Sequence, residues 1–347
     1  PPPSLAWAPL GLPRLPYHGR HAGRRPPPHP RGHRRGPRAP LRLLHQRQRP
    51  RPQPRGPGLP AKGRPEPLPR PPLPEATPGP GRGPRGLPRT GTSELIHRLA
   101  RWTYLRGPIL LLPPTFGEYA RAARALDLPL WEAESPEAFL ELLPKSSLAF
   151  LCVPNNPTGE VYPFLEEAAR RAGGALVLDL AYYDLMEFPP PLPQTAFRLY
   201  SPNKAHGLTG VRAGYLLAPL DLTHFQNLAP SWPLSVYGEA FLHAHLDPEA
   251  RAWLEGSKRE LFRLRGLLAE GLRGLGLEVR ESPANFLMVR VGRATEEARD
   301  MRERCIRVRD CTSFGLTEWL RLSSQREEAI RALLLALEEV LAGKLRA

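Results

Sequence analysis

The polar stretch that follows residue 200 holds the side chains best suited to chemistry. Its sequence, SPNKAHGLTGVR, places Lys204 three residues after Ser201 and eight residues before Arg212. A hydroxyl and a guanidinium can hold a phosphate together, through a hydrogen bond and a forked ion pair. The glycines between them allow a backbone to approach a ligand closely. A neighbouring cation lowers the pKa of a lysine, and the neutral amine can then form a Schiff base with a carbonyl group.

Two further polar loops follow apolar runs that are typical of buried strands. The run SLAFLCV (147–153) leads into the loop signal PNNPTG (154–159), and ALVLD (175–179) leads into LAYYDL (180–185). Strands that are nearly all apolar and alternate with helices indicate an α/β sheet covered on both faces. The loops that follow such strands meet at one edge of the sheet, where the sites of open α/β sheets gather.

The rest of the chain supplies the elements that must position these loops. Helical spacing of apolar residues predicts helices at 93–103, 117–126 and 163–172, and short apolar runs predict further strands at 108–112, 196–200 and 214–218. From about residue 236 the pattern changes. A long charged helix (248–274) precedes strands near 277–281, 285–291, 305–309 and 319–323 and a closing amphipathic helix (325–342). These patterns predict a large domain at 91–235 and a smaller α+β domain at 236–347.

In this order and spacing, the three polar stretches resemble motifs of fold-type I pyridoxal-phosphate enzymes, in the class I/II aminotransferase family. SPNKAHGLTGVR resembles the family's lysine motif, VPNNPTG its Asn-Pro-x-Gly loop, and LDLAYYDL its Asp-x-Ala-Tyr strand end. The resemblance covers essentially everything after residue 90. It implies a mostly parallel sheet sandwiched by helices, a smaller C-terminal α+β domain and pyridoxal 5'-phosphate as cofactor. It also implies a homodimer, provided that the N-terminal segment is intact.

The resemblance also implies a role for each matching residue around the cofactor ring. Lys204 is expected to form the Schiff base, and Asp179 to pair with the pyridine nitrogen and keep the ring an electron sink. Asn156 and Tyr182 are expected to donate hydrogen bonds to the phenolic oxygen. Phe116, in PPTFGEY (113–119), matches the aromatic residue that stacks on the ring.

The same resemblance assigns the residues that hold the cofactor phosphate. Ser201 and Arg212 match two phosphate ligands of the family. The turn GTSE, which contains Thr92 and Ser93, opens a predicted helix, and the backbone N–H groups at a helix N-terminus suit an anion.

Two arginines of the small domain point to the substrate. Arg321, in WLRLS (319–323), matches an arginine that binds a substrate carboxylate through a bidentate fork. The stretch VRDCTSFGL (308–316) resembles L-threonine-O-3-phosphate decarboxylase, which serves cobalamin biosynthesis, and Arg309 in it is a candidate ligand of the substrate phosphate. The alternative within this branch is a histidinol-phosphate or related aminotransferase. A substrate amino acid that carries a phosphate is therefore expected, bound to the cofactor through its amine.

Residues 1–90 differ from the rest of the chain in composition. They hold eighteen arginines and Lys62 against Glu66 and Glu75, whereas the remaining residues are close to neutral. They also hold 27 of the 46 prolines and no Val, Ile, Phe, Met, Cys, Asp or Asn. Such a tract cannot build an ordinary core.

Several interpretations of this tract remain open. It is a disordered basic arm, a polyproline-type ligand, or a coding region read out of frame. Two family segments that normally precede the large domain, Ser/Thr-x-Asn-x-Asn-Pro and Tyr-Pro-Asp-Pro, are missing here. One-base shifts of HQRQR (45–49) and LPRPPLPE (68–75) allow similar strings, which favours the frame interpretation. A binding protein that contacts nucleic acid through the basic arm is the alternative of another class.

Cysteine usage and hydropathy argue against a disulfide framework, a structural zinc site and a membrane-spanning helix. Cys152, Cys305 and Cys311 form no Cys-x-x-Cys pair, which argues against a disulfide framework or a structural zinc site and fits a reducing compartment. No apolar run approaches the ~20 residues of a membrane-spanning helix. We therefore expect a cytoplasmic enzyme with no metal and no membrane partner.

Overall fold

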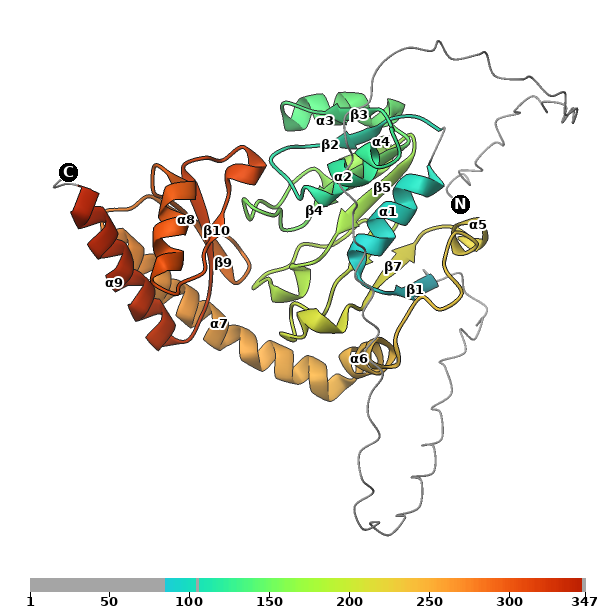
Figure 1. The fold of residues 1–347 in the computed structure, drawn as a ribbon. Helices are drawn as coiled ribbons and strands as arrows, with labels where there is room; N and C mark the ends of the chain where they lie inside the picture. Colours follow the sequence, from blue (N-terminus) through green and yellow to red (C-terminus); the bar gives the residue numbers. More distant parts are fainter. Residues whose placement is uncertain (1–84, 104–105, 345–347) are drawn as a thin grey trace, which may run out of the picture. The chain divides into compact units, whose positions relative to one another are not determined.

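The computed structural model describes residues 85–103 and 106–344, and these form two β-sheets with their covering helices (Figure 1). The interpretations of the basic N-terminal tract concern residues outside this part, except at its end. There, β1 (Arg85–Arg89) pairs antiparallel with β7 (Gly214–Ala218). The large sheet thus begins before residue 91.

The large sheet has seven strands in the order β1-β7-β6-β5-β4-β2-β3. Its central members are β2 (Ile109–Leu111), β4 (Leu148–Cys152), β5 (Ala175–Asp179) and β6 (Phe197–Tyr200), with β3 (Leu130–Glu132) at the far edge. These five strands run parallel, and β7 runs antiparallel to both of its neighbours, β6 and β1. Every residue of β2, β4 and β5 is buried, because helices cover both faces of the sheet.

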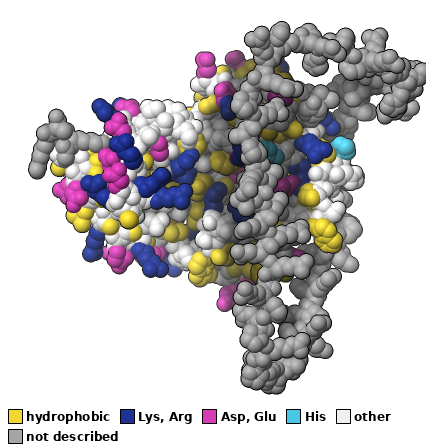
Figure 2. All heavy atoms as spheres, in the orientation of Figure 1, with side chains coloured by type: hydrophobic (Ala, Val, Ile, Leu, Met, Phe, Trp, Pro, Cys, Tyr) yellow, Lys and Arg dark blue, Asp and Glu magenta, His cyan; other side chains and the backbone are white. Residues whose placement is uncertain are grey.

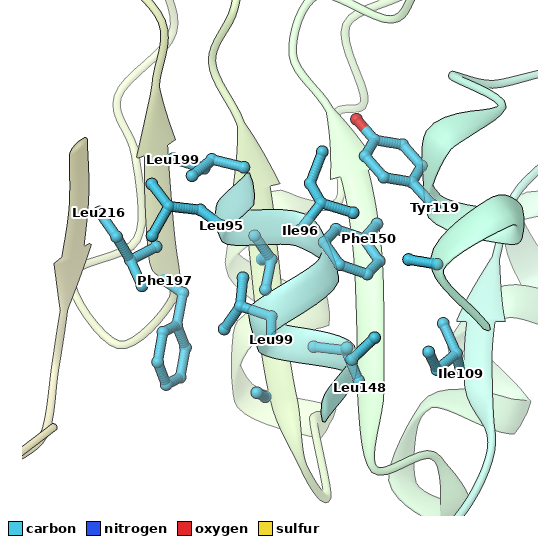
Figure 3. Packing of buried hydrophobic residues seen from close by; sticks show 14 of the residues in the cluster. Leu95, Ile96, Leu99, Ile109, Tyr119, Leu148, Phe150, Phe197, Leu199 and Leu216 are labelled. Atoms are coloured by element: carbon cyan, nitrogen blue, oxygen red, sulfur yellow. The ribbon is translucent and has the colours of Figure 1, made fainter. Parts of the chain in front are cut away.

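Helix α1 (Thr92–Trp102) covers one face of this sheet. Leu95, Ile96 and Leu99 recur at helical spacing and are fully buried against alternate strand residues such as Phe150 and Leu199, as Figure 3 shows. Helices α2 (Glu118–Arg124) and α5 (Thr223–Gln226) pack on the same face. Burying a side chain of this size contributes about 1.5–3 kcal/mol, so this cluster fixes α1 firmly over the strands.

A second cluster covers the opposite face. Helices α3 (Pro136–Leu142) and α4 (Leu165–Arg171) bury Phe139 and Leu165 against Leu151 and Leu178, which point away from α1. The alternation along β4 and β5 therefore reflects two packed faces, as the apolar runs predict.

The smaller domain carries an antiparallel sheet in the order β10-β11-β9-β8. The strands are β8 (Val279–Glu281), β9 (Phe286–Arg290), β10 (Arg309–Asp310) and β11 (Trp319–Ser323). Helices α7 (Pro248–Gly274), α8 (Ala294–Glu303) and α9 (Glu327–Lys344) bury their apolar sides against it. The strand predicted at 305–309 is wrong for most of its length, since only Arg309 pairs with β11. Helix α6 (Val236–Leu246) precedes α7, and the sequence patterns did not predict it.

This topology brings the chemistry-bearing loops together. Because β4, β5 and β6 are parallel, the loops after Cys152, Asp179 and Tyr200 leave from one edge of the sheet. Strand β7 is antiparallel, so its first residue, Gly214, lies at that same edge, as does the end of β1. The loops that contain Asn156, Tyr182, Lys204, Arg212 and Thr92 therefore share one rim.

Candidate active site

A buried carboxylate lies at the centre of this rim. Asp179 ends β5 and is 2% exposed. Its Oδ1 accepts a hydrogen bond from the Ala181 N–H at 3.1 Å, and its Oδ2 accepts one from the Tyr119 hydroxyl at 2.7 Å. Burial raises the pKa of Asp179, while Lys204 and these two donors act against that rise. The side chain is thus held in one orientation by two donors.

Lys204 lies on the loop after β6, half-buried beside an aromatic ring. Its Nζ is 4.6 Å from the ring centroid of Tyr182, and the Arg321 guanidinium is 5.8 Å from the same centroid. Phe286 of β9 packs edge-on against Tyr182, with 5.0 Å between the ring centroids. The structure therefore brings Lys204, Tyr182 and Arg321 together, from segments far apart in the sequence.

The two asparagines of the PNNPTG loop have different roles. The amide N–H groups of Asn155 are already used in hydrogen bonds within the protein. Its Nδ2 donates to the Pro114 carbonyl at 2.8 Å and to the Thr158 hydroxyl at 2.9 Å. Asn156 instead meets Arg321, which donates to its Oδ1. The Asn156 amide N–H groups are then the ones able to donate to a ligand, as the resemblance implies.

An anion-binding turn lies where α1 begins. Gly91 precedes the helix with a φ of +81°, a left-handed value that favours glycine. A Cβ on Gly91 would lie 3.1 Å from Nη2 of Arg212, so the guanidinium rests against this turn. Thr92 is buried and Ser93 half-buried in the first turn of the helix, whose N–H groups have no partner within the helix. A guanidinium beside such N–H groups suits a phosphate.

Three other predicted residues occupy distinct surroundings. Ser201 is buried, and its hydroxyl donates to Oδ1 of Asn203 at 2.7 Å. Phe116 is half-buried and packs edge-on against Tyr119 at 5.5 Å between ring centroids. Arg309 is exposed, donates to the Ser313 hydroxyl at 2.8 Å, and makes no contact with Lys204 among those described.

Sequence reasoning missed two residues behind Asp179. The sequence patterns assign Tyr119 no role, although its hydroxyl donates a hydrogen bond to the carboxylate. Cys152 lies beside Asp179 on the neighbouring strand, and burial raises the pKa of its thiol to about 12. The available signal for Tyr119 was its position three residues after Phe116, at the start of a short predicted helix.

The PNNPTG loop also touches the small domain. Gly159 has a φ of +79°, and a Cβ there would lie 2.4 Å from Cβ of Ser282. Nearby, the Glu187 N–H donates to the Pro283 carbonyl at 3.1 Å. The segment 282–284 of the small domain thus packs on the loops that carry Asn156 and Tyr182.

Comparison with known proteins agrees with this arrangement. The family model described as "Aminotransferase class I and II" matches residues 87–337. The chain belongs to the class I and II aminotransferases. Histidinol-phosphate aminotransferase of Rubrobacter xylanophilus is 30% identical over 67% of the chain and 70% of that relative.

Solved structures of other aminotransferase-fold proteins share the fold of this chain. Aspartate aminotransferase of Thermus thermophilus superposes with a TM-score of 0.66 at 25% identity, over 74% of this chain and 75% of that one. L-Threonine-O-3-phosphate decarboxylase of Porphyromonas gingivalis superposes with a TM-score of 0.60 at 23% identity, over 74% of this chain and 83% of that one. The predicted fold, a mostly parallel sheet sandwiched by helices with a smaller α+β domain, is confirmed.

The protein is a pyridoxal-phosphate-dependent enzyme, and its rim fits this cofactor. The turn at Gly91 leaves space that a Cβ would fill, next to a guanidinium that suits a phosphate. A buried carboxylate held by two donors suits a protonated ring nitrogen. The loop after β6, which carries Lys204, leaves the sheet between these two features, and Tyr182 lies against Lys204. The residues present therefore match both charged ends of the cofactor.

Two general properties complete the description. Within residues 85–103 and 106–344, no helix combines the length and apolarity needed to cross a membrane. Over this same part, no group of three or more His, Cys, Asp or Glu side chains could hold a metal ion. Figure 2 shows acidic and basic side chains interspersed over the described face in view. By residue count, the basic excess of the chain belongs to residues 1–90.

Proposed function

We propose that this aminotransferase-family enzyme decarboxylates L-threonine O-3-phosphate. The observation that carries the proposal is the pairing of Arg309 on β10 with Arg321 on β11, directly opposite each other in the small sheet. Opposed residues of an antiparallel pair project from one face, with Cβ atoms about 5 Å apart. Two guanidiniums on one face suit a substrate with two anionic groups close together.

The two arginines differ in ways that match two different anions. Arg321 is half-buried and lies against Tyr182 and Phe286, which suits a carboxylate close to the reacting carbon. Arg309 is exposed, lies over the Phe314 ring at 5.0 Å and holds the Ser313 hydroxyl beside it. A guanidinium with a neighbouring hydroxyl suits a phosphate at the far end of the substrate.

The second candidate is transamination of histidinol phosphate. Relatives that carry this name support it, among them one of 30% identity that the chain covers over two thirds of its length. The reactions differ in the bond that breaks. Decarboxylation breaks the bond from Cα to the carboxylate, releases CO₂ and places a proton on Cα, whereas transamination breaks the Cα–H bond and needs a keto acid as the amino acceptor.

The residues of this chain would act as follows in either reaction. Bound pyridoxal phosphate would supply an electron sink for the carbon that carries the substrate amine. Asp179 would pair with its ring nitrogen, Asn156 and Tyr182 would donate to its phenolic oxygen, and Arg212 would hold its phosphate. Lys204 Nζ is the group able to hold the proton that Cα gains or loses. Arg321 would orient the substrate and so decide which bond is exposed.

The test uses the full chain loaded with pyridoxal phosphate. Release of CO₂ from L-threonine O-3-phosphate, with no keto acid formed, would support the decarboxylase. Glutamate formed from 2-oxoglutarate in the presence of histidinol phosphate, together with no CO₂ release from L-threonine O-3-phosphate, would instead select the aminotransferase. Arg309→Gln should raise the KM for threonine phosphate about 10-fold or more, because a hydrogen-bonded charge pair is lost.

We further infer a homodimer in the cytoplasm. Trp232, Val236 and Tyr237 are 92, 79 and 81% exposed, and they are close in sequence, with Trp232 shortly before α6 and the other two in its first turn. An exposed apolar patch of this kind marks an interaction surface. Sedimentation analysis should give twice the mass of one chain, and Tyr237→Glu should give a monomer. We also propose that the large and small domains meet near residue 235, with β1 included in the large domain.

A further inference from the structure

Tyr119 occupies a position behind the cofactor rim that no assigned role explains. It lies in the second position of α2, and its whole side chain is buried. Its ring stacks on Phe150 with 4.5 Å between centroids and an interplanar angle of 5°. Phe116 packs edge-on against it, with 5.5 Å between ring centroids. Figure 3 shows the hydroxyl pointing away from the labelled apolar side chains, so the ring has one fixed polar end.

That polar end meets the carboxylate of Asp179. The distance from the Tyr119 hydroxyl to Oδ2 is 2.7 Å, a full hydrogen bond for a hydroxyl donor. The other oxygen is held by the Ala181 N–H. Rotation of the carboxylate would break both bonds. The phenol thereby helps to fix the plane of the carboxylate, and its hydrogen bond also favours the ionised form.

We propose that Tyr119 is a positioning residue that holds Asp179 ionised and correctly oriented toward the cofactor's ring nitrogen. The proposal rests on the role proposed above for Asp179. In this proposal, α2 and the turn before it position two groups around the cofactor ring. Phe116, in the turn, would cover the cofactor ring, and Tyr119, in α2, would orient the Asp179 carboxylate.

The charges around Asp179 agree with this role. Burial raises the pKa of the carboxyl, and the groups that oppose the rise are Lys204, Tyr119 and the Ala181 N–H. The Cys152 thiol is the remaining titratable neighbour, and its pKa of about 12 keeps it neutral. Burial also raises the pKa of Tyr119, so its hydroxyl stays a donor. Removal of this donor would therefore push the carboxyl further toward its neutral form.

The test is Tyr119→Phe, which keeps the stacked ring and removes the hydroxyl alone. We would titrate the full chain with pyridoxal 5'-phosphate and, separately, with its 1-deaza analogue, in which C–H replaces the ring nitrogen. The variant should bind pyridoxal phosphate about 10- to 100-fold more weakly, the range expected for one lost hydrogen bond to a charged group. Binding of the deaza analogue should change less than about 3-fold, because this compound has no ring nitrogen to pair.

A pH series adds a second readout. Ionised Asp179 is present above its pKa and lost as the pH falls through it. Because Tyr119→Phe raises that pKa, cofactor binding by the variant should weaken at a higher pH than binding by the wild type. Tyr162→Phe is the matched control. It removes the hydroxyl of another buried tyrosine, which packs beside Phe164 and not against Asp179.

The outcomes separate the alternatives. Equal weakening with both compounds would mean that Tyr119 is merely structural, and unchanged binding would mean that the hydroxyl is idle; either result overturns the inference. Unchanged binding together with CO₂ release would overturn it while leaving the proposed function intact. A wild-type chain that binds neither compound would overturn both.

Discussion

Replacement of Gly159 by alanine should destabilise the contact between the PNNPTG loop and the small domain. The backbone there has a φ of +79°, and in this region a side chain costs about 1–2 kcal/mol. The added Cβ would lie 2.4, 2.8 and 2.9 Å from Cβ, Oγ and Cα of Ser282. Since one of these atoms is backbone, rotation of the serine cannot relieve the overlap, and overpacking costs about 1–3 kcal/mol more.

The expected loss for Gly159→Ala is therefore about 2–5 kcal/mol, the sum of those two terms. In a protein of this size, the midpoint of thermal unfolding should fall by roughly 5–15 °C. Far-UV circular dichroism of the full chain would measure it. Gly276→Ala is the matched control, because its φ is +76° and nothing lies within 4 Å of the added Cβ. It should show the backbone cost alone.

A double-mutant cycle with Ser282→Gly isolates the contact. This change removes two of the three overlapping atoms, so Gly159→Ala should cost about 1–2 kcal/mol less in its presence. The reasoning is refuted if Gly159→Ala is no worse than Gly276→Ala, or if the two substitutions of the cycle are strictly additive. Either result would mean that the loop does not pack on Ser282.

Three further outcomes are expected. Lys204→Ala should lose the visible absorption band of bound cofactor and reduce turnover by at least about 100-fold, since the proton-transfer group is gone; a spectrum identical to wild type would contradict this. Arg212→Gln should raise the Kd for pyridoxal phosphate about 10-fold or more in a fluorescence titration, whereas its KM for the substrate amine should stay constant. The Nε2 atom of His206 lies 3.1 Å from Nδ1 of His245, and burial lowers the pKa of His245 to about 4. This pair therefore stabilises the fold above about pH 6.5, and its contribution is lost as the pH falls toward 4, because the unfolded chain binds protons first. The drop in melting temperature between pH 7 and pH 4.5 should be smaller in His245→Phe.

Local sequence was enough to predict much of the large domain. The buried strands at 148–152 and 175–179 and the helix at 92–102 lie within two residues of their predicted bounds. Their signals are local, since apolar runs bounded by loop residues specify buried strands in any α/β protein. The short edge strand β3 and the strand β1 escaped prediction because edge strands need little apolar sequence.

The candidate site divides in the same way. Sequence by itself determined which residue types stand at which strand ends, and parallel topology then forces Asp179, Lys204 and Asn156 onto one rim. The reason is that alternating strands and helices in the sequence indicate a parallel sheet, and the loops after parallel strands leave from one edge. Family resemblance added the roles of these residues.

Tertiary structure alone decided which side chains meet across that rim. Arg321 reaches Asn156 from 165 residues away, and Tyr119 reaches Asp179 from 60 residues away. Gly159 contacts Ser282 only because the two domains pack together at that point. No periodicity or spacing encodes such contacts, because they depend on how helices and loops pack over the finished sheet. The protonation and orientation of the buried carboxylate depend on the same packing, so they too emerge only in the folded chain.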